Sequence, residues 1–147
     1  MLRKITTADV GLIIEMLHAL HAESPHYNKV LADEQYVRNN LSVMTEHPSF
    51  IGVIDADLRG FMFGTTAQQW YDPELNAHEL LLYILPEYRG GLLAARLIRQ
   101  FEKDAERLNC VHVRAGTSTR IGTEEVLRLY ERLGYTREAN TVSKRIN

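Results

Sequence analysis

The chain has 147 residues and a formal net charge of −2, with 45% hydrophobic and 24% charged residues. This composition is typical of a globular domain and argues against general nucleic-acid binding, which draws its affinity from clustered Lys and Arg. No apolar run approaches the roughly 20 residues of a membrane span, and residues 1–5 lack the apolar core of a signal peptide. Cys110 stands alone, so no internal disulfide forms. We expect one domain over residues 1–147 in a reducing, cytoplasmic setting, without membrane contact.

The first half of the chain predicts two helices and a hairpin. Thr7 and Asp33 have side chains that cap helix starts, and apolar residues follow each at helical spacing. Pro48 must end the second helix. The expected elements in chain order are a strand at 2–5, a helix from Thr7, a loop at 23–31, a helix from Asp33 to about 47, and hairpin strands at 50–54 and 58–66.

The second half predicts a central strand followed by two strand–helix crossings. Residues 69–73 break the pattern, and the strand at 78–85 is apolar on both faces toward its end, which indicates a central position. Gly134 is suited to end the last helix. The expected elements are a helix from about 91, a strand at 110–115, a short helix around 126–133, and closing strands at 135–138 and 141–146. This order predicts an α/β fold with a mixed sheet and helices on its faces.

A glycine turn separates the central strand from the following helix. Arg89, Gly90 and Gly91 form this turn. The first N–H groups of a helix lack partners within the helix, and the helix dipole places partial positive charge there. Adjacent glycines let the backbone approach an anion without an obstructing Cβ. The turn therefore predicts a site for a phosphate-bearing ligand at the carboxyl end of the strand.

Two motifs together resemble the GNAT superfamily of acetyl-CoA-dependent N-acyltransferases. The first runs from Tyr83 to Ala94 and is similar to the family's pyrophosphate loop. The second, Leu129-Tyr130-Glu131-Arg132-Leu133-Gly134-Tyr135, is similar to its late helix. The resemblance implies a mixed, mostly antiparallel twisted sheet with a splayed central strand and helices on both faces. It also implies acetyl-CoA as co-substrate and no metal.

The resemblance assigns cofactor contacts along the first motif and after the 110–115 strand. It implies that the following residues contact the cofactor: Ile84, Leu85, Arg89, Gly90, Gly91, Leu92, Leu93, Ala94 and Ser118. Ile84 and Leu85 would act through their backbone on the pantetheine arm. Leu92 departs from the pattern, because glycine is usual at that position. The family often has asparagine where this chain has Thr117, Ser118 and Thr119.

Acyl transfer from a thioester to an amine needs a base for the amine and an acid for the departing thiolate. The resemblance implies direct attack in a ternary complex and makes Tyr130 the candidate acid; spacing alone would make it a core tyrosine. Glu79 is the candidate base, directly or through water, and His78 is its rival. Both also fit a solvated strand start. Alternation places Glu79 with Leu81 and Tyr83 on one face, unless a bulge, common in this strand of the family, changes the parity.

The acceptor is expected to be a primary amine on a small molecule, peptide or protein lysine. Tyr27, Trp70, Tyr71 and Asp72 lie in two irregular segments. Aromatic rings with one acid suit a cationic amine, although a packed loop or a homodimer contact fits them too. His18 and His21 lie three apart on one helix without a third metal ligand nearby in sequence. An alternative to the enzyme is a module of the same fold, without turnover, that binds CoA or a protein partner.

Overall fold

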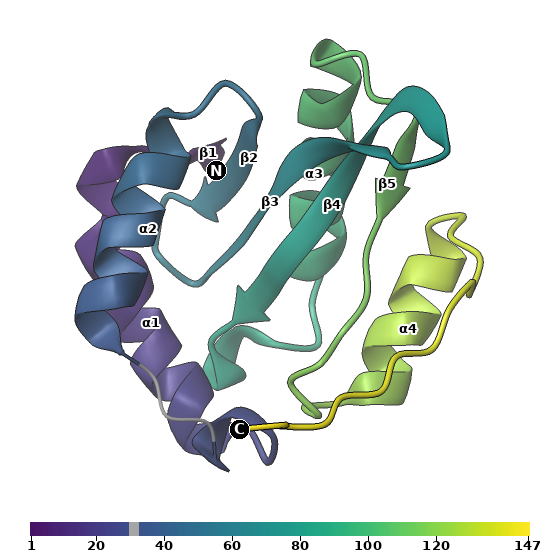
Figure 1. The fold of residues 1–147 in the computed structure, drawn as a ribbon. Coiled ribbons are helices and arrows are strands. Elements are labelled where there is room, and N and C mark those ends of the chain that lie inside the picture. Colours follow the sequence, from purple (N-terminus) through teal and green to yellow (C-terminus); the bar gives the residue numbers. More distant parts are fainter. Residues whose placement is uncertain (30–32) are drawn as a thin grey trace.

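A computed structural model describes residues 1–29 and 33–147, and in this part of the chain one five-stranded sheet is flanked by four α-helices (Figure 1). The strands lie side by side in chain order: β1 (Leu2–Lys4), β2 (Phe50–Asp55), β3 (Gly60–Gln69), β4 (Asp72–Ile84) and β5 (His112–Arg114). The helices are α1 (Val10–Glu23), α2 (Glu34–Glu46), α3 (Leu93–Arg107) and α4 (Thr123–Arg132). Three short 3-10 helices are η1 (Thr7–Asp9), η2 (Tyr27–Lys29) and η3 (Pro86–Tyr88).

The sheet is mixed. Strands β1 to β4 pair antiparallel, and β5 pairs parallel to β4. The β4–β5 ladder joins residues 76–78 only to residues 112–114, after which the two strands separate. This confirms the expected mixed, mostly antiparallel sheet; the strand that separates from its neighbour is β4, which lies between β3 and the edge strand β5 rather than at the centre.

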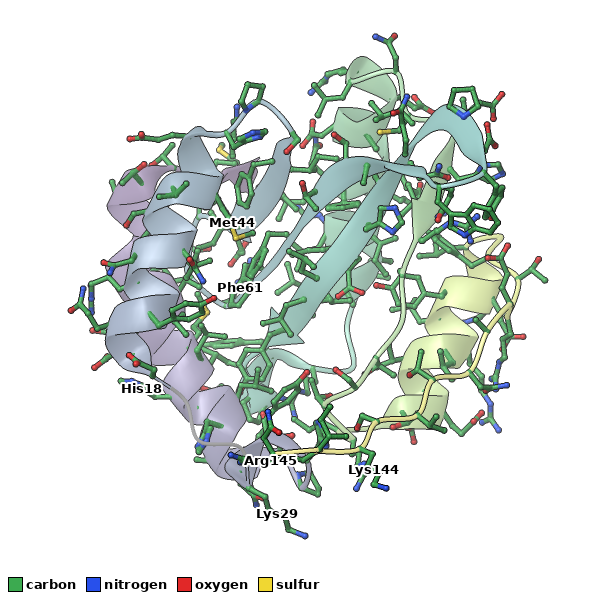
Figure 2. All side chains as sticks on the ribbon, in the orientation of Figure 1. His18, Lys29, Met44, Phe61, Lys144 and Arg145 are labelled. Carbon is green, nitrogen blue, oxygen red and sulfur yellow. The ribbon has the colours of Figure 1, made fainter. Side chains whose placement is uncertain are left out.

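Helices cover both faces of the sheet because side chains alternate along β3. Phe61 and Phe63 pack with α1 and α2, while Met62 packs with α3 and α4. Figure 2 shows Phe61 between the sheet and the two N-terminal helices. Phe101 of α3 is fully buried on the other face. The fold class predicted from the sequence is therefore confirmed, and no helix in the described residues has the length and apolarity to cross a membrane.

The helix starts follow local capping chemistry. The N–H of Tyr36 donates to Asp33 Oδ1 at 2.9 Å, which confirms Asp33 as the cap of α2. Thr7 is not the cap of α1: it is the first residue of η1, and α1 begins at Val10. Asp9 tightens this turn, because it accepts from the Thr6 N–H at 2.8 Å and from Arg3 at 2.7 and 2.9 Å. The predicted loop at 23–31 contains η2, and positions 30 and 31 of that prediction lie outside the described residues.

A β-bulge interrupts β4 at Leu80. Phe63 pairs with Leu81, but Gly64 pairs with Glu79, so Leu80 is an extra residue that is 53% exposed. Beyond the bulge, Leu81 and Tyr83 pack toward α1. Before it, Ala77 packs toward α3, and alternation places Glu79 on that same side. The bulge therefore changes the parity, as the sequence analysis allowed, and Glu79 does not share a face with Leu81 and Tyr83.

The two closing strands do not form. Residues 135–147 contain neither helix nor strand, and residues 136–147 are exposed as they run along α4 (Figure 1). Val142 and Ile146, the large apolar side chains of the second predicted strand, are 101% and 84% exposed. An alternating pattern without a buried face does not fix a strand. Strand β5 is shorter than predicted because its pairing with β4 ends after three residues, and β4 begins earlier than predicted, at Asp72.

Candidate active site

The separation of β4 and β5 opens a cleft of about 1400 Å³. Its walls come from residues 79–82 of β4, from β5 and the first residues (115–119) of the β5–α4 loop (residues 115–122), from α3 and α4, and from residues 133–141 after α4. Glu79 and Tyr130 both line it. The N–H of Gly116 donates to Glu79 Oε2 at 3.2 Å, and this bond spans the cleft just beyond the last paired residues.

Glu79 is a half-buried carboxyl in the cleft wall. Burial raises its pKa from 4.5 to about 7, and backbone N–H bonds from Gly116 and Leu82 partly oppose that rise. A carboxyl with this pKa is ionised in a large fraction near neutrality and binds a proton strongly enough to act as a base. The bulge at Leu80 sets the face on which this side chain lies.

His78 does not line the cleft, although it precedes Glu79 in sequence. It pairs in register with Thr65 on one side and Arg114 on the other. Burial, and then the nearby charge of Arg114, lower the pKa of its imidazole. The geometry therefore favours Glu79 over His78 as the candidate base.

Tyr130 is 4% exposed, and its hydroxyl has no hydrogen-bond partner within the described residues. The ring meets Tyr135 edge-on at 4.9 Å between centroids, and the Tyr135 hydroxyl donates to Glu102 Oε1 at 3.0 Å. Burial, and then the charge of Glu79, raise the pKa of the Tyr130 phenol well above its usual range. A buried hydroxyl without a partner costs free energy, which suits a group that meets a ligand in the cleft.

The glycine loop (residues 89–92) joins η3 to α3. Gly90 has φ +86°, a conformation that glycine adopts readily. A Cβ at Gly90 or Gly91 would meet no heavy atom within 4 Å, so the loop has an open face. Leu92 caps α3 with φ −91° and is 77% exposed. Leucine in place of glycine therefore causes no backbone strain here.

Arg89 is held by the protein itself. Its Nε donates to the Ile84 carbonyl at 2.9 Å, and its two terminal nitrogens donate to the Glu23 carboxylate of α1. The guanidinium also lies over the Tyr83 ring, 5.5 Å from the centroid. The predicted pairing of Arg89 with phosphate would compete with these bonds.

Backbone groups of both residues predicted to bind the cofactor arm have partners in the protein. The Leu85 N–H donates to the Arg59 carbonyl at 2.9 Å, and the Leu85 carbonyl accepts from the Tyr88 N–H at 3.0 Å. The Ile84 carbonyl accepts from Arg89. Leu93 and Ala94 form the first turn of α3, where N–H groups are free for an anion. The contacts of Ile84, Leu85, Leu93 and Ala94 with a cofactor stay predictions.

Tyr27 and Ser118 contact each other. Their hydroxyl oxygens lie 2.6 Å apart. The sequence assigned Tyr27 to the acceptor and Ser118 to the cofactor, and the structure joins the two at the β5–α4 loop. Ser24 strengthens this junction, since its Oγ donates to the Thr119 carbonyl at 2.6 Å.

Trp70, Tyr71 and Asp72 lie apart from the cleft residues. They form the β3–β4 turn, at the opposite end of β4 from the glycine loop (Figure 1). Thirteen strand residues span roughly 35–40 Å. Trp70 is 94% exposed and meets Tyr71 edge-on at 5.3 Å. None of the three lines the cleft, and their role in acceptor binding stays a prediction.

Sequence reasoning missed Glu23, Glu102 and Tyr135. A carboxylate at the last residue of a helix is unfavourable with the helix dipole, so Glu23 carried a usable signal. The partnership of Tyr135 with Glu102 left no local signal, because the two residues are 33 positions apart. No group of three His, Cys, Asp or Glu in the described part of the chain is arranged to hold a metal ion.

Comparison with known proteins identifies the family. The sequence model of the acetyltransferase (GNAT) family matches residues 14–135. No curated protein matches the chain significantly. Among solved structures, that of a probable acetyltransferase matches with a TM-score of 0.78 at 16% identity. The alignment covers 100% of this chain and 98% of the acetyltransferase chain. The structure of an aminoglycoside acetyltransferase from an uncultured soil metagenomic sample matches with a TM-score of 0.75 at 16% identity, and the alignment covers the same shares of the two chains.

A ribosomal-protein-alanine N-acetyltransferase from Brucella melitensis biovar Abortus 2308 has a TM-score of 0.72 at 15% identity, covering 99% of each chain. At these identities the structural matches establish the fold. The family match spans most of the 147 residues. The chain therefore belongs to the acetyltransferase (GNAT) family and is an acyltransferase.

Proposed function

We propose that this protein is an N-acetyltransferase that moves the acetyl group of acetyl-CoA to a primary amine by direct attack in a ternary complex. The observation that carries the proposal is the cleft between β4 and β5. It combines a carboxyl with a pKa of about 7, on Glu79, with a buried phenol without a partner, on Tyr130. These are the base and the acid that acyl transfer to an amine requires.

The cleft, and the glycine loop that follows β4, fit different parts of acetyl-CoA. The glycine loop has an open face, and α3 begins directly after it, so backbone N–H groups of residues 93–95 are available to a pyrophosphate. The cleft volume of about 1400 Å³ leaves room for an extended arm. The orphaned hydroxyl of Tyr130 lines the same cleft. Leu92 is the departure within the glycine loop, and its side chain is exposed.

When bound, acetyl-CoA supplies an acetyl group activated as a thioester. Glu79 removes a proton from the ammonium group of the acceptor, directly or through a water, so that the amine becomes a nucleophile. The amine nitrogen would then bond to the acetyl carbon, and Tyr130 would donate its phenol proton to the sulfur as the carbon–sulfur bond breaks. Because its pKa is raised, the Tyr130 phenol is protonated near neutrality. Burial of both groups strengthens their electrostatic effect on the reacting atoms.

The acceptor class is tested with an amine panel. Similar folds carry names that refer to aminoglycosides and to ribosomal-protein alanine, so the panel includes an aminoglycoside, a polyamine, a peptide with a free α-amine and a peptide with an internal lysine. Release of free thiol from acetyl-CoA is measured. Acetyl-CoA at 100 times its dissociation constant should also stabilise the protein by roughly 2.7 kcal/mol. Absence of both thiol release and a thermal shift at millimolar acetyl-CoA would contradict the proposal.

Tyr130→Phe separates chemistry from binding. Loss of a general acid typically lowers turnover by about 10²-fold or more, and we expect that loss with unchanged affinity for CoA. Tyr36→Phe is the matched control, since Tyr36 is 66% exposed on α2. Normal turnover of Tyr130→Phe on every accepted amine would show that another group protonates the sulfur.

A further inference from the structure

The end of α1 bonds to the strand and loop on one side of the cleft. Glu23 is the last residue of α1, where the helix dipole disfavours a carboxylate. Its Oε1 nevertheless accepts from the Tyr83 hydroxyl at 2.6 Å and from Arg89 Nη2, and its Oε2 accepts from Arg89 Nη1 at 2.9 Å. The bonds from Arg89 contribute most, and together with the bond from Tyr83 they hold the pKa of Glu23 below its usual range.

Arg89 transmits this contact to the glycine loop. It is the first residue of the loop, and its Nε bond to the Ile84 carbonyl fixes the side chain against the end of β4. The side chains of Arg89 and Glu23 are only 33% and 27% exposed, so solvent weakens the pair less than it would a surface pair. Gly90 and Gly91, which follow, have the greatest conformational freedom of any residues and lose the most on ordering.

The same segment bonds to the other side of the cleft. Ser24 is fully buried and donates to the Thr119 carbonyl, while its Oγ accepts from the Tyr27 N–H at 2.9 Å. Tyr27 reaches Ser118 through its hydroxyl. Residues 23–27 therefore contact both loops that follow the separating strands, the glycine loop after β4 and the β5–α4 loop after β5.

We propose that Glu23 is a positioning residue for the pyrophosphate-binding loop, and that residues 23–27 hold the two sides of the cleft in their binding geometry. The inference rests on the proposed use of acetyl-CoA. Glu23 neutralises the charge of Arg89, so the pair contributes order to the loop, while the backbone N–H groups of the loop and of α3 contribute the attraction for phosphate. A loop that is ordered before binding loses less entropy when the ligand arrives.

If Glu23 instead competed with the ligand for Arg89, its removal would have the opposite effect on the affinity for CoA. If Arg89 were chiefly a phosphate ligand, Glu23 would compete with the pyrophosphate for it. Removing the carboxylate would then free the guanidinium and tighten the binding of CoA. If Glu23 positions the loop, its removal weakens the binding of CoA.

The test compares CoA with pantetheine, which lacks the pyrophosphate. Dissociation constants are measured by titration calorimetry for the wild type, Glu23→Gln and Glu15→Gln, which alters an exposed glutamate of the same helix. We expect Glu23→Gln to weaken CoA binding about tenfold, equivalent to about 1.4 kcal/mol, with pantetheine and Glu15→Gln unchanged. Unchanged or tighter CoA binding would overturn the inference. A wild type that binds neither ligand would instead overturn the proposed function.

A double variant tests whether Glu23 acts through Arg89. If it does, Glu23→Gln combined with Arg89→Met should bind CoA no more weakly than Arg89→Met alone. Additive losses would show that Glu23 acts by another route and would overturn the inference. Pantetheine affinity in each variant reports whether the cleft itself is intact.

Discussion

The carboxyl of Glu79 should make the protein less stable as the pH rises through neutrality. Its pKa is raised by burial from 4.5 to about 7 in the folded protein. The folded state therefore holds this proton more tightly than the unfolded chain. The contribution of the protonated carboxyl to stability is fully present below about pH 4.5 and is lost as the pH rises through about 7. Replacing Glu79 with Gln, which has no proton to lose, should abolish that dependence.

The size of the effect follows from the shift. A difference of 2.5 between 4.5 and about 7 corresponds to roughly 3 kcal/mol in the free energy of unfolding. Glu79 is half-buried rather than fully enclosed, and solvent screening reduces this figure, so we expect about 1–2 kcal/mol. Glu79→Gln should thus be the more stable protein above pH 7, and the advantage should shrink toward pH 5.

Urea unfolding followed by circular dichroism at pH 5, 6, 7 and 8 measures this difference directly. Glu15→Gln, an exposed change on α1, is the matched control and should show no such trend. With an accepted amine, the wild-type rate should rise with a midpoint near pH 7, and Glu79→Gln should lose that rise. A stability difference that stays constant across this range would refute the burial of an ionisable group at Glu79.

Two further substitutions test the loop and the sheet. Leu92→Gly should tighten acetyl-CoA binding about fivefold, or about 1 kcal/mol, because it removes an exposed side chain from the glycine loop. The thermal shift with acetyl-CoA measures this change. Unchanged affinity would mean that the Leu92 side chain does not contact the ligand. Gly64→Ala should destabilise the protein by more than about 2 kcal/mol in urea unfolding, since a Cβ would lie 2.1 Å from the His78 carbonyl oxygen. Gly11→Ala in α1 meets nothing within 4 Å and should cost no stability; equal losses in both would contradict the steric argument.

Local signals predicted the elements, and non-local contacts determined the details of the site. Asp33 and Pro48 act on their own helix, so the bounds of α2 could be predicted from them. The glycine turn before α3 could be placed for the same reason. Arg89, in contrast, finds its partner 66 residues earlier in the chain, at Glu23. No spacing rule in the sequence predicts that pair.

The face on which Glu79 lies depended on a single unpaired residue. Alternation along β4 could be counted correctly, but the pairing with β3 shifts between Phe63 and Gly64, and the shift arises from the partner strand and from the packing on both faces. The closing strands failed for a related reason. Their alternation was present, yet Val142 and Ile146 bury nothing in this structure.

The bulge at Leu80 limits which changes the sequence of β4 can accept. Its effect comes from the number of residues between Glu79 and Leu81, and the exposed side chain of Leu80 plays little part in it. Substitutions at this position should leave the strand pairing unchanged, although the side chain lies in the cleft wall. Deletion of one residue at the bulge would have a larger effect than a substitution there. It would move either Glu79 or the core residues that follow it to the opposite face of the sheet. The position of Glu79 in the cleft therefore depends on the number of residues in this part of β4 more than on which residue occupies position 80.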